Sequence, residues 1–332
     1  MNSKTALVLG AGGFIGSHLV NRLKQEGFWV RGVDLKLPEY ATSVADDFVV
    51  GDLRNQQLCE SIFERQFDHV YQLAADMGGA GYIFTGDNDA DVMYNSAQIN
   101  LNIANLCRET KVDRVFYSSS ACIYPAYNQT DPNNPKCNET SAYPAEPDSE
   151  YGWEKLFSER ICRHYTEDFG LITRIVRYHN VYGPHGTYDG GREKAPAAIC
   201  RKVIQAKLSG MNEIEIWGDG NQTRSFMYID DCVKGTLDIM ASAIAEPLNL
   251  GSSQLVTINQ LVDIVEDIAQ VKLKRRYNLA APKGVNGRNS DNSLIQDLLG
   301  WQPSIRLEAG METTFRWIYD QMTKKQVLVG TV

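Results

Sequence analysis

Short apolar runs alternate with amphipathic stretches through the first 120 residues of the chain. The run Thr5–Leu9 (TALVL) is typical of a buried strand, and the periodicity from Phe14 to about Gln25 predicts a helix. We predict further strands at Val30–Asp34, Phe48–Val50, His69–Leu73 and Arg114–Tyr117, and helices at Asn55–Arg65 and about Val92–Glu109. Strands and helices that alternate in this way predict a parallel sheet with helices on both faces, because crossover connections are right-handed.

A proline-rich segment interrupts this alternation. Five of the eleven prolines lie between Pro125 and Pro147, after the last of these strands. Prolines at this density end helices and strands, so we predict an ordered loop. The loop leaves the carboxyl end of a central strand, where it is well placed to cover a ligand. The helix Tyr151–Phe169 and the strand Ile172–Arg177 are then predicted to continue the sheet.

The pattern becomes less regular after about Val181, with helices predicted near Ala197–Leu208, Asp230–Ala243 and Ile258–Ala269. We interpret this region as a smaller domain that closes over the edge of the sheet. The expected fold class is therefore α/β, a Rossmann-like doubly wound parallel sheet with a smaller C-terminal substrate domain. We place the two domains at residues 1–180 and 181–332, with an interleaved boundary.

Three glycines connect the first strand to the first helix. Gly10, Gly13 and Gly16 stand in the sequence GAGGFIG, and Phe14 and Ile15 open the helix. Glycines at these positions permit a tight turn, the approach of a pyrophosphate to backbone N–H groups, and close packing of the helix on the strand. Because glycine-rich turns are common, the motif predicts dinucleotide binding only in this strand–turn–helix context.

Acidic residues at the ends of the next two strands extend this prediction. Asp34 ends the second strand, 24 residues after Gly10. A carboxylate there accepts hydrogen bonds from ribose hydroxyls and repels a 2′-phosphate, which favours NAD over NADP; the alternative is a helix or turn cap. Asp52, after the third strand, either bonds the adenine amino group or caps a turn. We therefore predict that residues 1–180 bind NAD.

Composition narrows the class of function. The chain has 41 Asp and Glu against 33 Lys and Arg, a net charge of −8, which argues against a generic nucleic-acid binder. No apolar run approaches the ~18 residues that a membrane span needs, and the amino terminus does not resemble a signal peptide. The seven cysteines and five histidines show no metal-ligand or Cys-x-x-Cys spacing. We expect a cytoplasmic protein with free thiols and with no metal, membrane or nucleic-acid partner.

A tyrosine and a lysine four residues apart are candidates for catalysis. Tyr151 and Lys155 lie on one face of their predicted helix, where an ammonium stabilises a phenolate and lets the tyrosine act as a base toward an alcohol. Ser120, just past a predicted strand in the run Ser118–Ser120, is placed to hold the substrate hydroxyl. Serine clusters after strands are more often turn formers, and a Tyr-x-x-x-Lys pair is common by chance. Both signals therefore depend on the dinucleotide motif.

Together, the glycine motif, the strand-end acid, the serine and the Tyr-x-x-x-Lys pair resemble the extended short-chain dehydrogenase/reductase family, whose members commonly act on nucleotide sugars. Further segments resemble one branch of that family, which inverts carbons 3 and 5 of the hexose of GDP-D-mannose. They lie at 74–79 (AADMGG), 119–125 (SSACIYP), 190–198 (GGREKAPAA), 217–226 (WGDGNQTRSF) and 287–292 (GRNSDN). The likeness covers nearly the whole chain.

The resemblance implies an isomerase that retains NAD and converts a GDP-sugar, GDP-D-mannose, to GDP-L-galactose and GDP-L-gulose. Transient oxidation at carbon 4, with Tyr151 accepting the hydroxyl proton, makes the hydrogens on carbons 3 and 5 acidic. Enolisation and re-reduction then complete the inversion with no net redox change. The resemblance assigns the base to Cys122 and the acid to Lys194, in addition to the catalytic Tyr151, Lys155 and Ser120. By analogy, the chain forms a homodimer through helices of the first domain.

Cys122 and Lys194 each have a plain structural alternative. A lone cysteine after a strand is usually a small buried hydrophobe, so Cys122 is a base only if Lys194 or the NAD cation stabilises its thiolate. A loop lysine is usually solvated. Lys194 is an acid only if desolvation or a neighbouring cation lowers its pKa.

The resemblance also implies a set of binding residues. Arg224 and Arg288 have forked donors suited to a diphosphate, Lys202 is expected at a phosphate, and Asn180 is expected to bond the sugar. Isolated arginines are usually surface residues, so Arg288 rests mainly on the resemblance. The predicted substrate-binding residues are Gly78, Gly79, Ser120, Ala121, Cys122, Asn180, Lys194, Lys202, Gln222, Thr223, Arg224 and Arg288. The predicted cofactor-binding residues are Gly10, Gly13, Phe14, Ile15, Gly16, Asp34, Asp52, Tyr151 and Lys155.

Other functions remain open at this point. A nucleotide-sugar 4-epimerase or 4,6-dehydratase shares the hydride step, but a 4-epimerase needs no base at carbons 3 and 5. A catalytically silent NAD-sensing scaffold would keep the fold without turnover, against which the intact Ser120, Tyr151 and Lys155 argue. The residues do not decide between guanine and uracil as the base of the nucleotide.

Overall fold

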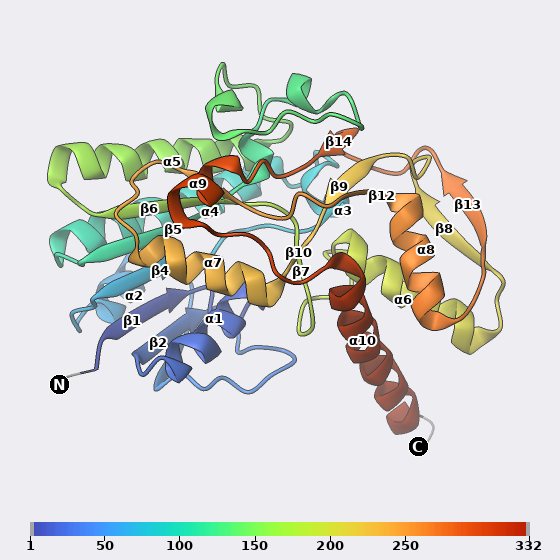
Figure 1. Ribbon diagram of the computed structural model, residues 1–332. Coiled ribbons are helices and arrows are strands. Elements are labelled where there is room, and N and C mark those ends of the chain that lie inside the picture. The colour runs from blue at the N-terminus through green and yellow to red at the C-terminus, as the bar shows by residue number, and fades with distance from the viewer. Residues whose placement is uncertain (1–2, 330–332) are drawn as a thin grey trace.

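Seven parallel strands form one central sheet in the computed structural model, which describes residues 3–329 (Figure 1). The strand order is β11-β6-β5-β4-β1-β2-β3. The strands are β1 (Thr5–Leu9), β2 (Trp29–Asp34), β3 (Asp47–Val50), β4 (His69–Gln72), β5 (Arg114–Ser120), β6 (Thr173–Tyr178) and β11 (Leu248–Leu250). The order in which strands are added to the sheet reverses between β1 and β4: β2 and β3 extend the sheet on one side of β1, and β4, β5 and β6 extend it on the other. The predicted doubly wound fold is therefore confirmed.

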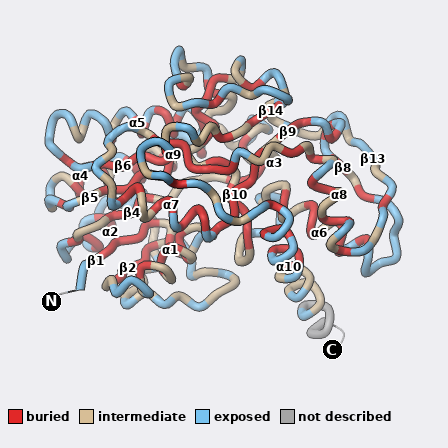
Figure 2. The backbone as a smooth tube through the Cα atoms, in the orientation of Figure 1, coloured by how far each residue is buried: buried red, intermediate tan, exposed pale blue. Residues whose placement is uncertain are grey.

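Helices cover both faces of this sheet. Helix α1 packs against α7 on one face, while α4 packs against α2 and α5 on the other. Their bounds are α1 (Phe14–Gln25), α2 (Gln56–Ile62), α4 (Asp89–Glu109), α5 (Glu150–Phe169) and α7 (Ile229–Ala241). Because both faces are covered, the central strands are buried along most of their length instead of alternating between buried and exposed positions, and Figure 2 shows the sheet as mostly buried.

The C-terminal part of the chain forms a smaller unit beside the carboxyl ends of the strands (Figure 1). It contains α6 (Ala195–Ser209), β8 (Glu213–Trp217), β9 (Thr223–Ser225), β12 (Leu255–Thr257), α8 (Ile258–Ala269), β13 (Lys274–Asn278), β14 (Gly287–Arg288) and α10 (Leu307–Val329). Short elements complete the fold: α3 (Ala80–Ile83), β7 (Val181–Tyr182), β10 (Met227–Tyr228), α9 (Ser293–Leu299) and the 3₁₀ turns η1 (Ala121–Ile123), η2 (Ala126–Gln129) and η3 (Glu139–Ala142). Because α7 and β11 return to the main sheet, the chain crosses between the two units more than once.

Several predicted boundaries differ from the structure. Strand β5 continues to Ser120, so the serine run lies inside the strand and not after it. It continues because α5 satisfies the polar groups of the run: Ser119 Oγ donates to Glu159, and Lys155 Nζ donates to the Ser118 carbonyl. Helix α4 begins three residues earlier than predicted, at Asp89. Helix α10 was not predicted, and within residues 3–329 no helix is long and apolar enough to cross a membrane.

Candidate active site

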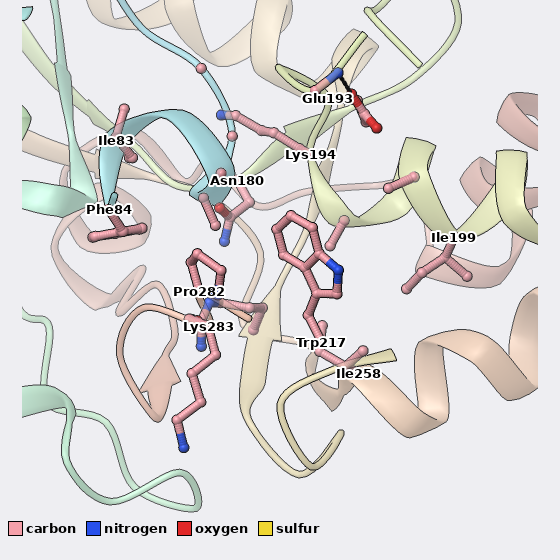
Figure 3. Close-up of a pocket in the computed structure, with 18 of the residues that line it drawn as sticks. Ile83, Phe84, Asn180, Glu193, Lys194, Ile199, Trp217, Ile258, Pro282 and Lys283 are labelled. Carbon is pink, nitrogen blue, oxygen red and sulfur yellow. Dashed lines mark hydrogen bonds between the residues drawn. The ribbon is translucent and has the colours of Figure 1, made fainter. Parts of the chain in front are cut away.

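A cavity of about 530 Å³ lies where the carboxyl ends of the central strands meet the smaller unit. Its wall is built from α3, the end of β5, the start of α5, the loop before α6, and the strands β8 and β9 (Figure 3). Eleven of the twelve predicted substrate-binding residues line it, together with Tyr151: Gly78, Gly79, Ser120, Ala121, Cys122, Asn180, Lys194, Lys202, Gln222, Arg224 and Arg288. Thr223 does not line it, because its hydroxyl donates to the Pro132 carbonyl.

Tyr151 and Ser120 line the cavity, and Lys155 is buried close to them. Lys155 is 1% exposed, its Nζ donates to the Ser118 carbonyl at 2.9 Å, and it lies 5.7 Å from the centre of the Tyr151 ring. In the chain alone, burial raises the pKa of Tyr151, while a hydrogen bond with Ser120 and the charge of Arg288 act in the opposite direction. Phenol, amine and hydroxyl are therefore held together in one buried cluster.

Cys122 stands directly after β5, in the turn η1, and is 6% exposed. Its backbone N–H donates to Ser120 Oγ at 3.1 Å, and Arg288 Nη1 donates to its sulfur at 3.0 Å. The first turn of α5 lies against this segment, where a Cβ on Gly152 would meet the Cys122 carbonyl oxygen at 2.1 Å. Glycine beside Tyr151 is therefore what lets the tyrosine and the cysteine share one wall.

Lys194 is the N-cap residue of α6, and it points into the cavity in Figure 3 while its neighbour Glu193 points away. The Glu193 carboxylate accepts hydrogen bonds from Gly191 N and from Arg201, each at 2.7 Å, which fixes the loop. Burial lowers the pKa of Lys194, while electrostatic interaction with Cys122 and Cys232 opposes that shift and the charge of Arg288 adds to it. The desolvation that an acid role for this lysine requires is therefore present.

Two glycine-containing loops meet at the mouth of the cavity. Gly79 N donates to the Arg192 carbonyl at 3.0 Å, and a Cβ on Gly79 would come within 2.3 Å of the Glu193 carbonyl oxygen. The same two loops also meet where the guanidinium carbon of Arg192 lies 3.9 Å from the centre of the Tyr82 ring. Only glycine at position 79 allows this approach, so the AADMGG segment shapes the loop that carries Lys194.

The cationic residues expected at phosphates use many of their donors within the chain. Arg224 donates to the carbonyls of Thr223, Lys283 and Val285, and burial lowers its pKa to about 10. Lys202 donates to the Glu215 carbonyl at 3.0 Å. The contacts of these side chains with a phosphate remain predictions.

Gly12 and Gly13 of the glycine motif line a second, smaller hollow together with Phe14, Lys36 and residues 38–41. A Cβ on Gly16 would meet the Gly10 carbonyl oxygen at 2.0 Å, so helix and turn touch as the motif requires. Asp34 accepts hydrogen bonds from Gly12 N at 2.9 Å and from Leu35 N at 2.7 Å. Burial raises the pKa of Asp34, and these N–H groups oppose that rise. The cradle and its carboxylate fit the adenosine end of a dinucleotide.

Asp52 makes contacts that match the turn-capping alternative. Its Oδ1 accepts from Arg54 N at 2.9 Å, and its carboxylate pairs with the Arg54 guanidinium at 2.6 Å. The ion pair holds the pKa of Asp52 below its usual range. The adenine contact remains a prediction for this residue.

Replacement of Asp34 by asparagine is expected to weaken NAD binding by roughly 10- to 100-fold, because a charged acceptor of hydrogen bonds is lost. The same change should narrow the preference over NADP, since the charge that repels a 2′-phosphate is gone. Titration of apo-protein with each dinucleotide measures both effects. Asp267→Asn, at an exposed position on α8, is the matched control, and equal losses in the two variants would contradict the assignment of Asp34.

Sequence reasoning missed Asp148 and Gln129, which contact the cavity through another residue. Both accept hydrogen bonds from Arg288, at 2.5 Å each. They lie within or just after the proline-rich segment, and nothing in their local sequence distinguishes them from turn formers. They can be identified only from their contact with Arg288, which lies 140 or more residues away in the chain.

Comparison with known proteins relates the chain to enzymes of nucleotide sugars. The pattern of the NAD dependent epimerase/dehydratase family matches residues 6–251. GDP-mannose 3,5-epimerase of Arabidopsis thaliana is 46% identical over 321 residues, which cover 96% of this chain and 83% of that protein. GDP-mannose 3,5-epimerase 1 of Oryza sativa subsp. indica is 44% identical, with 96% and 82% covered.

Two solved structures show the same fold. UDP-glucose 4-epimerase of Thermotoga maritima, solved with UDP-glucose, has a TM-score of 0.83 and 25% identity, covering 96% of this chain and 99% of that one. UDP-glucuronic acid 4-epimerase of Bacillus cereus, in complex with UDP-glucuronic acid and NAD, has a TM-score of 0.79 and 26% identity, covering 96% and 99%.

Proposed function

The chain belongs to the NAD dependent epimerase/dehydratase family, and we propose that it inverts carbons 3 and 5 of the hexose of GDP-D-mannose. The products are GDP-L-galactose and GDP-L-gulose, and the cofactor is NAD. The observation that carries the proposal is the meeting of Cys122 and Lys194, 72 positions apart in the sequence, on the wall of one cavity with Tyr151. A 4-epimerase has no need of this additional thiol and amine.

The residues of the cavity divide the reaction into two kinds of proton transfer. When bound in the glycine cradle, NAD would supply the hydride acceptor for carbon 4 and the hydride donor for its re-reduction. Tyr151 takes the proton of the carbon 4 hydroxyl, with Ser120 holding that oxygen and Lys155 stabilising the phenolate. The resulting ketone acidifies the hydrogens on carbons 3 and 5, because the carbanion is delocalised as an enolate.

Inversion at carbon 3 or carbon 5 needs a base on one face of the ring and an acid on the other. The Cys122 thiolate removes the C–H proton and becomes a thiol, while the Lys194 ammonium gives a proton to the opposite face and becomes an amine. The return of the hydride to carbon 4, and of the proton from Tyr151 to its oxygen, restores an alcohol. Exchange of protons with water then resets the thiol and the amine.

The proposed division of labour along the chain follows from where these groups lie. Residues 1–180 supply the NAD cradle and the Tyr151 cluster, and residues 181–332 supply Lys194 and the arginines for the nucleotide sugar. The cytoplasm is the expected compartment, because all seven cysteines are buried free thiols, as is usual in a reducing environment.

Incubation of the protein with GDP-D-mannose in deuterated water tests the function directly. NMR of the recovered sugar nucleotides should show deuterium at carbons 3 and 5, together with the two inverted products. Deuterium at neither position would overturn the proposed chemistry, and a product inverted at carbon 4 would indicate a 4-epimerase. A 4-keto-6-deoxy product would indicate a dehydratase.

A homodimer is the proposed assembly, formed through α4 and α5. These neighbouring helices expose five large apolar side chains, each at least 40% accessible: Tyr94, Leu101, Trp153, Phe157 and Phe169. A second copy of the same helix pair would bury them.

Leu101→Glu combined with Phe157→Glu should therefore shift the protein from dimer to monomer, because charges replace the apolar contact. Light scattering measures the mass against the 37.2 kDa of one chain. Leu298→Glu, an exposed leucine on α9, is the control. A wild-type protein that is monomeric, or a double variant that stays dimeric, would contradict this assembly.

A further inference from the structure

We propose that Arg288 activates the Cys122 thiol as a base, and that Asp148 and Gln129 are positioning residues that aim Arg288 at the sulfur. The proposal rests on the function proposed above, and it gives Arg288 a different role from the diphosphate contact predicted from sequence.

The guanidinium of Arg288 has one protein acceptor for each of its nitrogen atoms. Nη1 donates to Cys122 Sγ at 3.0 Å, Nη2 to Asp148 Oδ2 at 2.5 Å, and Nε to Gln129 Oε1 at 2.5 Å. The planar fork of an arginine is rigid, so three contacts fix its orientation as well as its position. Only 7% of the Arg288 side chain and 6% of the Asp148 side chain are exposed, which strengthens the interactions of the charge with its neighbours.

The division of donors within Arg288 distinguishes this arrangement from an ordinary structural ion pair. Arginine and carboxylate groups often pair through two parallel hydrogen bonds, which satisfy both oxygens of the carboxylate. Here Asp148 takes one nitrogen, and the neighbouring Nη1 is directed to the sulfur of Cys122. A pair that served stability alone would gain from the second carboxylate bond, because a thiol is a weak acceptor and a thiolate a strong one.

The proline-rich segment holds the two positioning residues. Gln129 ends η2, and its Nε2 donates to the carbonyls of Tyr124 and Pro125, which leaves Oε1 free to accept from Arg288. Asp148 precedes Ser149, the N-cap of α5. The segment therefore connects the turn of Cys122 to the helix of Tyr151, and the order of this loop sets the place of the arginine.

Four cationic side chains interact electrostatically with Cys122. These cationic side chains come from four elements: Lys155 on α5, Lys194 before α6, Arg224 on β9 and Arg288 on β14. The phenol of Tyr151 also interacts electrostatically with Cys122. The anionic group that pairs with Arg288 is the Asp148 carboxylate, 2.5 Å from Nη2. Cationic neighbours stabilise a thiolate relative to a thiol, and Arg288 is the one that donates a hydrogen bond to the sulfur.

The other six cysteines are expected to react slowly with a thiol reagent, so the reactivity of Cys122 can be measured separately. Burial raises the pKa of each of their thiols: Cys59, Cys107, Cys137, Cys162, Cys200 and Cys232. None of the six lines the cavity, whereas Cys122 does. Iodoacetamide reacts with thiolates, the sulfur forming a bond to carbon as iodide leaves, so its rate of reaction with the native protein reports on Cys122.

The experiment follows the pH dependence of iodoacetamide alkylation in the NAD-loaded protein, with mass spectrometry to identify the labelled cysteine. Arg288→Gln should slow labelling of Cys122 at neutral pH by about tenfold or more, because the charged hydrogen bond to sulfur is lost. Asp148→Asn should slow it by a smaller factor, since the arginine remains but is no longer held. Arg163→Gln, an exposed arginine on α5, is the matched control and should label as the wild type does.

The double variant Arg288→Gln with Asp148→Asn guards against misfolding, because it leaves no unpaired buried charge. Its labelling should be as slow as that of Arg288→Gln, and its retained NAD shows that the chain is folded. Wild-type labelling rates in a folded Arg288→Gln or in the double variant would overturn the proposal.

Steady-state kinetics separates activation of the thiol from a grip on the diphosphate. Loss of kcat with slowed alkylation supports activation, whereas a raised KM with unchanged alkylation and kcat supports the grip and overturns the proposal. Alkylation requires no sugar substrate. A failure of deuterium exchange in the wild type would therefore overturn the proposed function, while the alkylation rates still decide whether Arg288 activates the thiol.

Discussion

Replacement of Cys122 by serine is expected to abolish deuterium exchange at carbons 3 and 5 while oxidation at carbon 4 continues. A serine hydroxyl does not ionise near neutral pH, so the variant keeps the size of the side chain and loses the base. General-base catalysis contributes about 10²- to 10⁴-fold, and the loss in the rate of epimer formation should fall in that range. NMR in deuterated water follows the exchange, and the ultraviolet absorbance of reduced nicotinamide follows the oxidation.

The two readouts together make this test specific for the proposed role. Cys59→Ser is the matched control, because its sulfur already donates to the Leu53 carbonyl and a hydroxyl can replace that contact. Wild-type exchange in Cys122→Ser would contradict the assignment of the base and favour a 4-epimerase. Loss of the nicotinamide signal as well would mean that the residue is needed for binding.

Tyr151→Phe should block oxidation and deuterium exchange together, because it removes the proton acceptor of the first step. Without that acceptor no ketone forms, so reduced nicotinamide, deuterium exchange and epimers should all fall by about 10²- to 10⁴-fold. The same absorbance and NMR measurements apply. Cys122 and Tyr151 therefore act at different stages, and only the tyrosine variant should block both.

Tyr117→Phe is the control for loss of a phenol hydroxyl near the same lysine. Its ring centre lies 5.0 Å from Lys155 Nζ, and its buried hydroxyl has Ser158, not Tyr151 or Ser120, as its side-chain hydrogen-bond neighbour. Removal of such a group costs little, so this variant should keep its activity. A Tyr151→Phe enzyme that still reduces its nicotinamide when the sugar is added would exclude Tyr151 as the proton acceptor.

Much of the sheet could be predicted because its signals are local. The order of strand, glycines, helix, strand and acid from Thr5 to Asp34 follows from short-range sterics and from burial on both faces. Helix α10 was missed, since the irregular pattern after Val181 gave no comparable sequence of elements. The serine run before Cys122 was placed outside the strand because its partners, Glu159 and Lys155, lie about 40 residues away on a predicted helix, and the local sequence does not show that this helix contacts the run.

Contacts between distant residues, which the local sequence does not predict, matter even more in the candidate site. The residues of the cavity wall came from resemblance to a family, because no local rule connects Cys122 to Lys194. The partners of Arg288 were missed, since Asp148 and Gln129 are 140 and 159 residues away from it in the chain. Isolated polar residues in a loop have many structural uses, and only the folded arrangement selects one of them.

The separation of 166 residues between Cys122 and Arg288 bears on how the protein is made. Synthesis proceeds from the amino terminus, and the segment with Cys122 leaves the ribosome long before β14 does. Until β14 arrives, the growing chain lacks the hydrogen bond from Arg288 that would sensitise the sulfur to oxidants. On the proposed role of Arg288, the Cys122 thiol therefore becomes reactive only after β14 has been synthesised and has folded against it.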